Sequence, residues 1–258
     1  MLESGDVDIS GTLIVDLIAL FHKIAKIPPT FSEYLESVIV KVKKLASSGC
    51  NRVDFVADNY LYKVSPIKKN EQNARGISER YEIKSLQSKC PDKLRERMLR
   101  NPHNKSRLVE LLGEFVSQNK QKVLEELKCS EIYISAEGNW ECVTLNEEMK
   151  VTLLASNQPE ADTRVILHTK HAVENTDTPV FLLSPSGDTD IVVLAISLLT
   201  NVSDRVYLID GSGQHRKIVK LKSLVQNRDF HEWLIGFHAF TGNDFVSSFF
   251  NHGKKNCL

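Results

Sequence analysis

The chain has 258 residues, of which 41% are apolar, and this is enough to build the core of a single α/β domain. Basic and acidic residues both total 33, so the net charge identifies no partner. Five cysteines without a C-x-x-C pair exclude a zinc knuckle and a closed disulfide framework. The start, MLESGDVD, is unlike a signal peptide, and the longest apolar run (191–199) is too short to span a bilayer, so we expect an intracellular protein without a membrane segment.

Short β-branched runs alternate with segments of helical periodicity, a pattern that predicts an α/β fold with a central, mostly parallel sheet. We expect strands at 12–16, 51–58, 131–136 and 179–184, and a hairpin over 206–221 that turns at 211–213. Helices are expected over 17–26, 30–46 and 108–127. Thr30 and Glu33 occupy capping-box positions of the second helix, and its predicted buried face consists of Phe31, Tyr34, Leu35, Val38, Val42 and Leu45.

Acidic residues recur where open α/β sheets bind ligands, outside the carboxyl ends of the strands. Asp16 and Asp58 end the first two predicted strands, and Asp188 and Asp190 follow the fourth in SPSGDTDIVVL. Further acids stand at the predicted helix start in NQPEADTRVILH (Glu160 and Asp162) and in the turn FTGNDF (Asp244). Each could instead cap a helix or bond to backbone amides, and for Asp162 or Asp188 capping is about as plausible as a functional role.

The conjunction of the seven acids favours a metal site. Carboxylates brought together repel one another unless cations neutralise them, and oxygen-only clusters select hard ions such as Mg²⁺ or Mn²⁺. Because no histidine or cysteine stands at ligand spacing among them, zinc is not expected. Two divalent ions held by carboxylates are typical of phosphodiester hydrolysis, so the sequence predicts a metal-dependent nuclease.

Residues 61–107 carry thirteen basic against five acidic side chains, a formal charge of +8 that leaves −8 for the rest of the chain. On its own, a run of charge is more often a solvated surface than a binding site. We expect this stretch to be a basic helical insertion in a single domain that covers residues 1–258.

The order of the acidic motifs resembles that of the flap endonuclease and related 5′-nuclease family of the PIN-like fold. The strings PEADTRVILHTKHA, GDTDIVVLA and FHAFTGNDFVSSFFNHGKK are similar to a divergent group of invertebrate proteins within it. The resemblance runs from about residue 8 to the C-terminus and is strongest over 156–255. It implies a PIN-like α/β/α domain and a structure-selective nuclease whose metal ligands would be Asp16, Asp58, Glu160, Asp162, Asp188, Asp190 and Asp244.

In that family the position of the basic stretch is occupied by a helical arch that admits single-stranded nucleic acid, so the resemblance implies a nucleic-acid partner, with DNA preferred over RNA. The expected phosphate contacts are Lys68, Lys69, Arg75 and Arg80, together with Lys254 and Lys255. The family's C-terminal helix-turn-helix would be truncated after HGKKNCL, and its glycine-led N-terminal segment is expected to be missing. The alternative hypothesis is an inactive remnant that keeps the fold and binds nucleic acid or protein.

Several other residues receive structural interpretations. His168 and His171 lie three positions apart on a predicted helix and are expected on its exposed face rather than at a metal. Core or edge packing is the expected role of Trp140 and Trp233, and Asp210 is expected to be a turn residue.

Overall fold

The structure is a computed structural model that describes residues 9–46, 49–59, 79–136, 139–144, 148–158, 160–183, 189–199, 204–210, 217–225 and 228–241. Its centre is an eight-stranded sheet in the order β5-β4-β3-β2-β1-β6-β7-β8. The strands are β1 (Thr12–Asp16), β2 (Arg52–Val56), β3 (Glu131–Ala136), β4 (Asn139–Thr144), β5 (Glu148–Lys150), β6 (Val180–Leu183), β7 (Val206–Asp210) and β8 (Lys217–Lys220).

The five inner strands, β3, β2, β1, β6 and β7, are parallel, whereas β4, β5 and β8 extend the two edges antiparallel. β1 lies between β2 and β6, with Val15 opposite Phe55 on one side and Leu183 on the other. The chain therefore places β2 to β5 on one side of β1 before it places β6 to β8 on the other. Such a reversal of strand order is where open α/β sheets form their ligand crevice.

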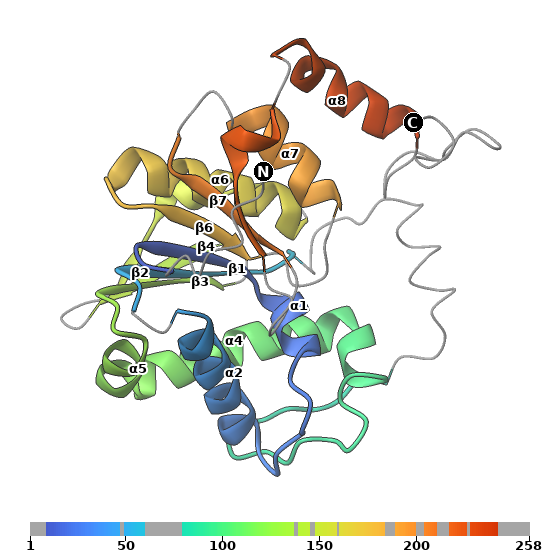
Figure 1. Ribbon diagram of the computed structural model, residues 1–258. Coiled ribbons are helices and arrows are strands. Elements are labelled where there is room, and N and C mark those ends of the chain that lie inside the picture. The colour runs from blue at the N-terminus through green and yellow to red at the C-terminus, as the bar shows by residue number, and fades with distance from the viewer. Residues whose placement is uncertain are drawn as a thin grey trace.

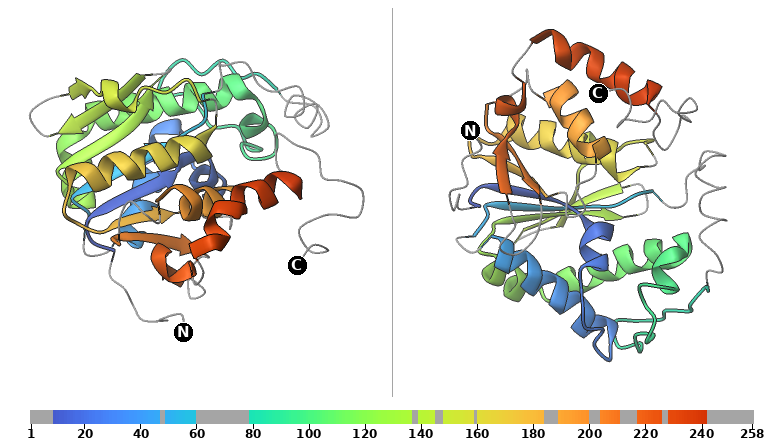
Figure 2. Two further views of the ribbon diagram at one scale, coloured as in Figure 1. Left: turned by 90° about the horizontal axis from the view of Figure 1, so that it is seen from above. Right: turned by 45° about the vertical axis from the view of Figure 1, so that its right-hand side comes forward.

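Helices cover both faces of the sheet (Figures 1 and 2). One layer contains α1 (Leu17–His22), α2 (Phe31–Leu45), α4 (Pro102–Gln118) and α5 (Lys120–Leu127). The other contains α6 (Ala161–Asn175) and α7 (Thr189–Leu199), and α8 (Arg228–Phe240) packs beyond α7. Short 3₁₀ turns occur at Met98–Arg100, Thr152–Leu154 and Leu221–Leu224.

Alternation along the strands divides the core into two halves. Leu13, Val15 and Phe55 point into the layer of α1, α2, α4 and α5, whereas Ile14 and Val56 point toward α6 and α7. Apolar side chains occupy both faces of β1 and β6, which are nearly continuous apolar runs, whereas β2 carries the charged residues Arg52 and Asp54. The α/β fold with a mostly parallel central sheet is confirmed.

The helix predicted over 30–46 is confirmed as α2. Thr30 is its N-cap, and the hydroxyl oxygen accepts a 3.3 Å hydrogen bond from the N–H of Glu33. The predicted apolar face is buried except for Leu45, which is only partly buried. Ile39, which was not predicted, is buried as well. The hairpin over 206–221 is confirmed by the pairing of β7 with β8, and its expected turn lies outside the described residues.

Other elements differ from expectation. The helix predicted over 17–26 ends at His22, where the N–H of Lys23 bonds to the carbonyl of Leu20. The helix predicted over 108–127 is two helices, because Asn119 ends α4 with its side-chain N–H bonded to the carbonyl of Phe115, and α5 begins at the next residue. β4 and β5 were not predicted.

Of the predicted helical insertion (61–107), the structure describes residues 79–107, in which 79–97 form turns and irregular backbone and 102–107 belong to α4. Ile83, Leu86 and Leu94 bury their side chains in the core, which ties these turns to the layer of α2 and α4. Asn104 binds the carbonyl groups of Glu79 and Met98, at 2.7 and 3.0 Å. Within the described chain, no helix has both the length and the apolar character needed to cross a membrane.

Candidate functional site

The carboxyl ends of β1, β2 and β6 meet at one edge of the sheet, since Asp16 pairs in register with Val56 and Val15 with Leu183. Asp16 ends β1 and is half-buried. Its Oδ1 accepts a 3.0 Å hydrogen bond from the N–H of Ala19 and so caps α1. Asp16 therefore bonds to a backbone amide, which is the structural alternative that the sequence allowed for this residue.

Asp58 follows β2 and contacts the start of α6. Its Oδ1 accepts a 2.7 Å hydrogen bond from the N–H of Ala161, the first residue of that helix. Glu160 is the N-cap residue and is buried, with 6% of its surface exposed, but its side chain makes no capping bond. Asp162 lies in the first turn of α6. The structure thus places Asp58 next to the residues that flank Ala161.

Asp190 lies in the first turn of α7, and its Oδ1 is 3.1 Å from Nε2 of His238 on α8. The side chain of His238 is 8% exposed and that of Asp190 is 25% exposed. His238 was not singled out from the sequence, because α8 is remote along the chain and a single histidine in WLIGFHA carries no ligand spacing. Asp188 and Asp244, the other two predicted acids, lie outside the described residues.

The donor set at this edge consists of carboxylate oxygens, which suit Mg²⁺ or Mn²⁺. Among the described residues, however, no three His, Cys, Asp or Glu side chains are grouped closely enough to hold a metal ion. Five of the seven predicted acids belong to that part of the chain. The arrangement brings together the starts of α6 and α7 and the ends of β1 and β2, and these helix N-termini carry partial positive charge that suits anionic groups.

Arg80 is the one predicted phosphate contact within the described residues, and it is exposed. It lines a surface cleft of about 530 Å³ together with His103 and Arg107. Arg107 is already paired with Glu110 at 2.9 Å and Glu114 at 2.7 Å, so Arg80 contributes the less compensated charge. Lys68, Lys69, Arg75, Lys254 and Lys255 lie outside the described residues.

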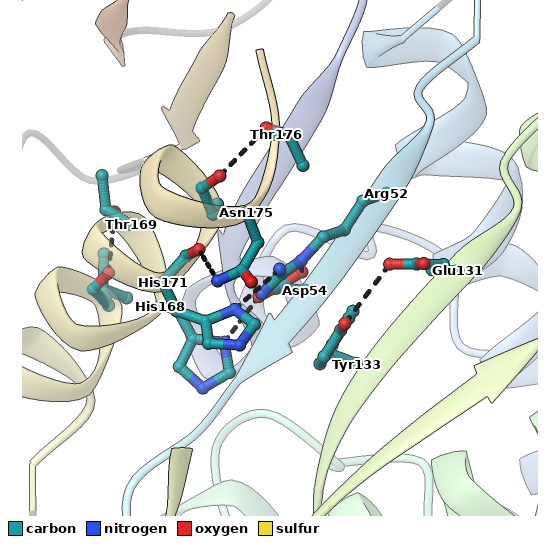
Figure 3. A network of polar contacts seen from close by, with 11 residues as sticks. Arg52, Asp54, Glu131, Tyr133, His168, Thr169, His171, Asn175 and Thr176 are labelled. Carbon is teal, nitrogen blue, oxygen red and sulfur yellow. Dashed lines mark hydrogen bonds and ion pairs between the residues drawn. The ribbon is translucent and has the colours of Figure 1, made fainter. Parts of the chain in front are cut away.

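A buried polar network joins α6 to β2 and β3 (Figure 3). The carboxylate of Asp54, fully buried in β2, accepts hydrogen bonds from Nε and Nη2 of Arg52 at 2.7 and 2.6 Å. Nδ1 of His168 lies 2.6 Å from Oδ2 of Asp54, and Nδ1 of His171 lies 2.9 Å from Nη1 of Arg52. The guanidinium also stacks on Tyr133, with Cζ 3.7 Å from the ring centroid. A guanidinium can only donate, so Nδ1 of His171 accepts and this histidine is neutral.

The expectation that His168 is exposed is wrong, since its side chain is completely buried. Trp233 also differs, because 74% of its surface is exposed on α8 instead of packed. For Trp140, the structure describes the backbone pairing in β4. A usable signal for the network was present in β2, where RVDFV places charged residues at alternate positions of an otherwise apolar strand.

The charges of the network are set by burial and by its partners. Burial raises the pKa of Asp54, but Arg52 and the hydrogen bonds from Arg52 and His168 outweigh it and bring that pKa below its ordinary value. Burial lowers the pKa of His168 below 6.5, although Asp54 opposes this. Burial, followed by the nearby Arg52, also lowers the pKa of His171. At neutral pH the network therefore consists of an ion pair and two neutral histidines.

Comparison with known proteins yields little. No protein-family model matches the sequence, and no curated protein matches it. Among solved structures, the chain is similar to the T5 D15 protein co-crystallized with metal ions, with a TM-score of 0.40 and 17% sequence identity. The similarity covers 90% of this chain, which spans 66% of the length of that one. A similarity of this size identifies neither a family nor an activity.

Proposed function

We propose that the protein is a divalent-metal-dependent nuclease that hydrolyses phosphodiester bonds of DNA or RNA and selects substrates by structure. The observation that supports this most is the position of Asp58, which binds the first amide of α6 beside Glu160 and Asp162. This contact makes two separate acidic motifs of the sequence neighbours at the crevice edge of the sheet. The proposed metal-binding residues are Asp16, Asp58, Glu160, Asp162, Asp188, Asp190 and Asp244.

The proposed metal-binding side chains have different roles. Asp16 and Asp58 each use one oxygen to fix a helix start, so both carboxylates are held in a defined orientation at this edge of the sheet. Glu160 and Asp162 add charge from the first turn of α6. Divalent ions in such a site supply an activated water and stabilise the leaving oxygen, so no protein general base is required.

Nucleic acid would be guided by the basic stretch. Arg80 is exposed at the cleft that it shares with His103, which suits contact with a phosphate group. Lys68, Lys69 and Arg75 would extend this track, and Lys254 and Lys255 would contact duplex phosphates. We propose DNA as the preferred substrate.

A second candidate is a remnant that keeps the fold and binds nucleic acid or protein without cleaving it. One observation favours it: three of the acids already have partners within the protein, namely Ala19 for Asp16, Ala161 for Asp58 and His238 for Asp190. On this reading the acids cap helices and pair with a histidine, and metal binding is not needed to explain them.

The deciding experiment is cleavage of labelled single-stranded, 5′-flap and hairpin substrates with Mg²⁺ or Mn²⁺. The native chain is compared with Asp188→Asn/Asp190→Asn. Metal-dependent cleavage that is lost in the double variant is the expected result, and the relative rates rank the substrates.

A matched control removes two exposed acids at and just beyond the opposite end of α6, Glu174→Gln/Asp177→Asn. This variant loses the same charge and should keep full activity. Absence of cleavage by native protein that binds Mn²⁺ and nucleic acid would favour the remnant, and equal loss in both double variants would point to a general charge effect.

A further inference from the structure

Four polar contacts join α6 to β2 and to the two residues that follow this strand. Their order along the helix is the reverse of their order along the strand. Nη1 of Arg52 meets Nδ1 of His171 at 2.9 Å, and Oδ2 of Asp54 meets Nδ1 of His168 at 2.6 Å. Next, Nη1 of Arg164 donates to the carbonyl of Ala57 at 2.8 Å. The last contact is that of Asp58 with the N–H of Ala161, at 2.7 Å. We refer to these four contacts as the polar ladder.

The order of the contacts shows that α6 runs antiparallel to β2, and similar lengths of strand and helix separate them. From Asp54 to Asp58 the strand advances about 13 Å, at roughly 3.3 Å per residue. From His168 back to Ala161 the helix covers about 10 Å, at roughly 1.5 Å per residue. These lengths match closely enough for both contacts to form together. A shift of the helix by one residue would rotate it by about 100° and break the contacts of His168 and Ala161 alike.

Stability alone does not explain a charged pair at this depth. Asp54 is completely buried and Arg52 is 2% exposed, and replacing such a pair by apolar residues of similar volume is often neutral or stabilising. Apolar contacts between a helix and a sheet tolerate small slides and rotations, because they have no direction. The contacts of a carboxylate with two guanidinium nitrogens and an imidazole do have direction. The contact with the imidazole of His168 crosses to α6 and favours one position of the helix along β2 and one rotation.

We propose that His168, through Asp54, is a positioning residue for the acidic site. It fixes the position of α6 so that Glu160 and Asp162 stand beside Asp58, with the contact of Arg164 between His168 and the start of the helix. His168 touches neither substrate nor metal in this role. The expected effect of His168 on metal binding rests on the proposed function. Its effect on the position of α6 does not.

The first test measures hydrogen exchange of the metal-free protein in peptides that cover 160–166. His168→Leu removes the imidazole donor, and the exchange of the first turn of α6 should become at least about tenfold faster than in the native chain. His168→Asn keeps an N–H donor near the position of Nδ1 and should restore exchange to within about threefold. Exchange in α2, on the other side of the sheet, should not change.

Thr169→Val is the matched control. Thr169 is also buried on α6, but its hydroxyl bonds to the carbonyl of Val165 within the helix at 2.8 Å, so this variant removes a buried hydrogen bond without touching the ladder. Exchange of 160–166 should stay within about threefold of native. If His168→Leu does not fold, His171→Leu replaces it, since this half-buried residue forms the outer contact of the ladder and a smaller effect in the same direction is expected.

The second test measures Mn²⁺ affinity by calorimetry at a temperature where all variants are folded. His168→Leu should weaken binding about tenfold or more, His168→Asn should restore most of it, and Thr169→Val should bind like the native chain. A residue that merely adds stability would leave the affinity of folded protein unchanged.

The two readouts separate the two proposals. If the native chain fails to bind Mn²⁺, the proposed function is overturned, and the exchange data still decide the positioning role. Uniformly faster exchange throughout α6 in both His168→Leu and Thr169→Val would overturn the positioning role. So would unchanged exchange of 160–166 in a folded His168→Leu or His171→Leu protein.

Discussion

The carboxylate of Asp58, just after β2, accepts a 2.7 Å hydrogen bond from the N–H of Ala161 and thereby supplies the cap that Glu160 does not give to α6. This contact allows the structural and the metal-binding roles of Asp58 to be separated. Asp58→Asn keeps an acceptor and should leave the free energy of unfolding nearly unchanged, whereas Asp58→Ala should lower it by about 1 kcal/mol. Urea unfolding without metal measures both values.

The same two variants also test metal binding. If Asp58 holds a cation, saturating Mn²⁺ should raise the melting temperature of the native chain but of neither variant, because the charge is lost in both. A full Mn²⁺ response in Asp58→Asn would show that capping is the whole role of Asp58.

Acid should destabilise the protein through the histidines of α6. The pKa values of His168 and His171 lie below 6.5 in the folded chain, so the unfolded chain binds more protons as the pH falls below about 6.5. The free energy of unfolding should therefore decrease from about pH 6.5 downward to the folded-state pKa values, and above that range these groups contribute their full stability. Each group adds a slope of at most about 1.4 kcal/mol per pH unit.

Urea unfolding at pH 7.5 and pH 5.5 tests this, with His168→Asn/His171→Asn as the comparison. The variant should be less stable at pH 7.5 but should lose less stability on acidification. His22, whose pKa is also lowered, remains in both proteins and therefore cancels. Equal slopes in the two proteins would contradict the assignment.

Breaking the buried pair should be costly. Asp54→Asn leaves the guanidinium of Arg52, which is 2% exposed, without its counter-charge, and this should lower the free energy of unfolding by about 3 to 5 kcal/mol. Glu174→Gln breaks the exposed pair with Lys170 on the same helix and should change little. Chemical unfolding of the two variants side by side gives the comparison, and similar losses would mean that the buried pair is electrostatically unimportant.

Two glycines should respond in opposite directions to alanine. Gly49 has φ of +92°, and a Cβ there would lie 2.6 Å from Cβ of Lys128, so Gly49→Ala should cost about 1 to 2 kcal/mol. Gly113 lies within α4 with open space around it, so Gly113→Ala should stabilise the protein by about 0.5 to 1 kcal/mol. Thermal unfolding of both variants tests this, and a stable Gly49→Ala protein would show that the backbone can relax there.

The elements that the sequence predicted well are those whose pattern is local. β1, β3 and α2 follow from apolar runs, helical periodicity and the cap at Thr30. Boundaries were missed where one side chain decides them, as Asn119 does between α4 and α5. Strands β4 and β5 were missed because NWECVT alternates weakly and its pairing with β3 is a tertiary contact.

At the site, the sequence indicated which acids end strands and begin helices, and the contact of Asp58 with α6 agrees with that reasoning. It did not indicate the partners of these acids. The pairing of Asp190 with His238 depends on how α8 packs on α7, and the burial of His168 depends on a charge placed in the middle of β2. Neither relation has a signature at fixed spacing along the chain.

The position of β1 in the sheet delays completion of the site during synthesis. β1 ends at Asp16, and β6, its neighbour on one side, begins at Val180. At about 5 to 20 residues per second, the ribosome needs roughly 10 to 30 s to make the intervening chain. In that interval β1 can pair with β2, and β2 with β3, while the other side of β1 stays open, and α6 is made only near the end of the interval. The nascent protein therefore has a period in which the sheet exists but the acidic site does not.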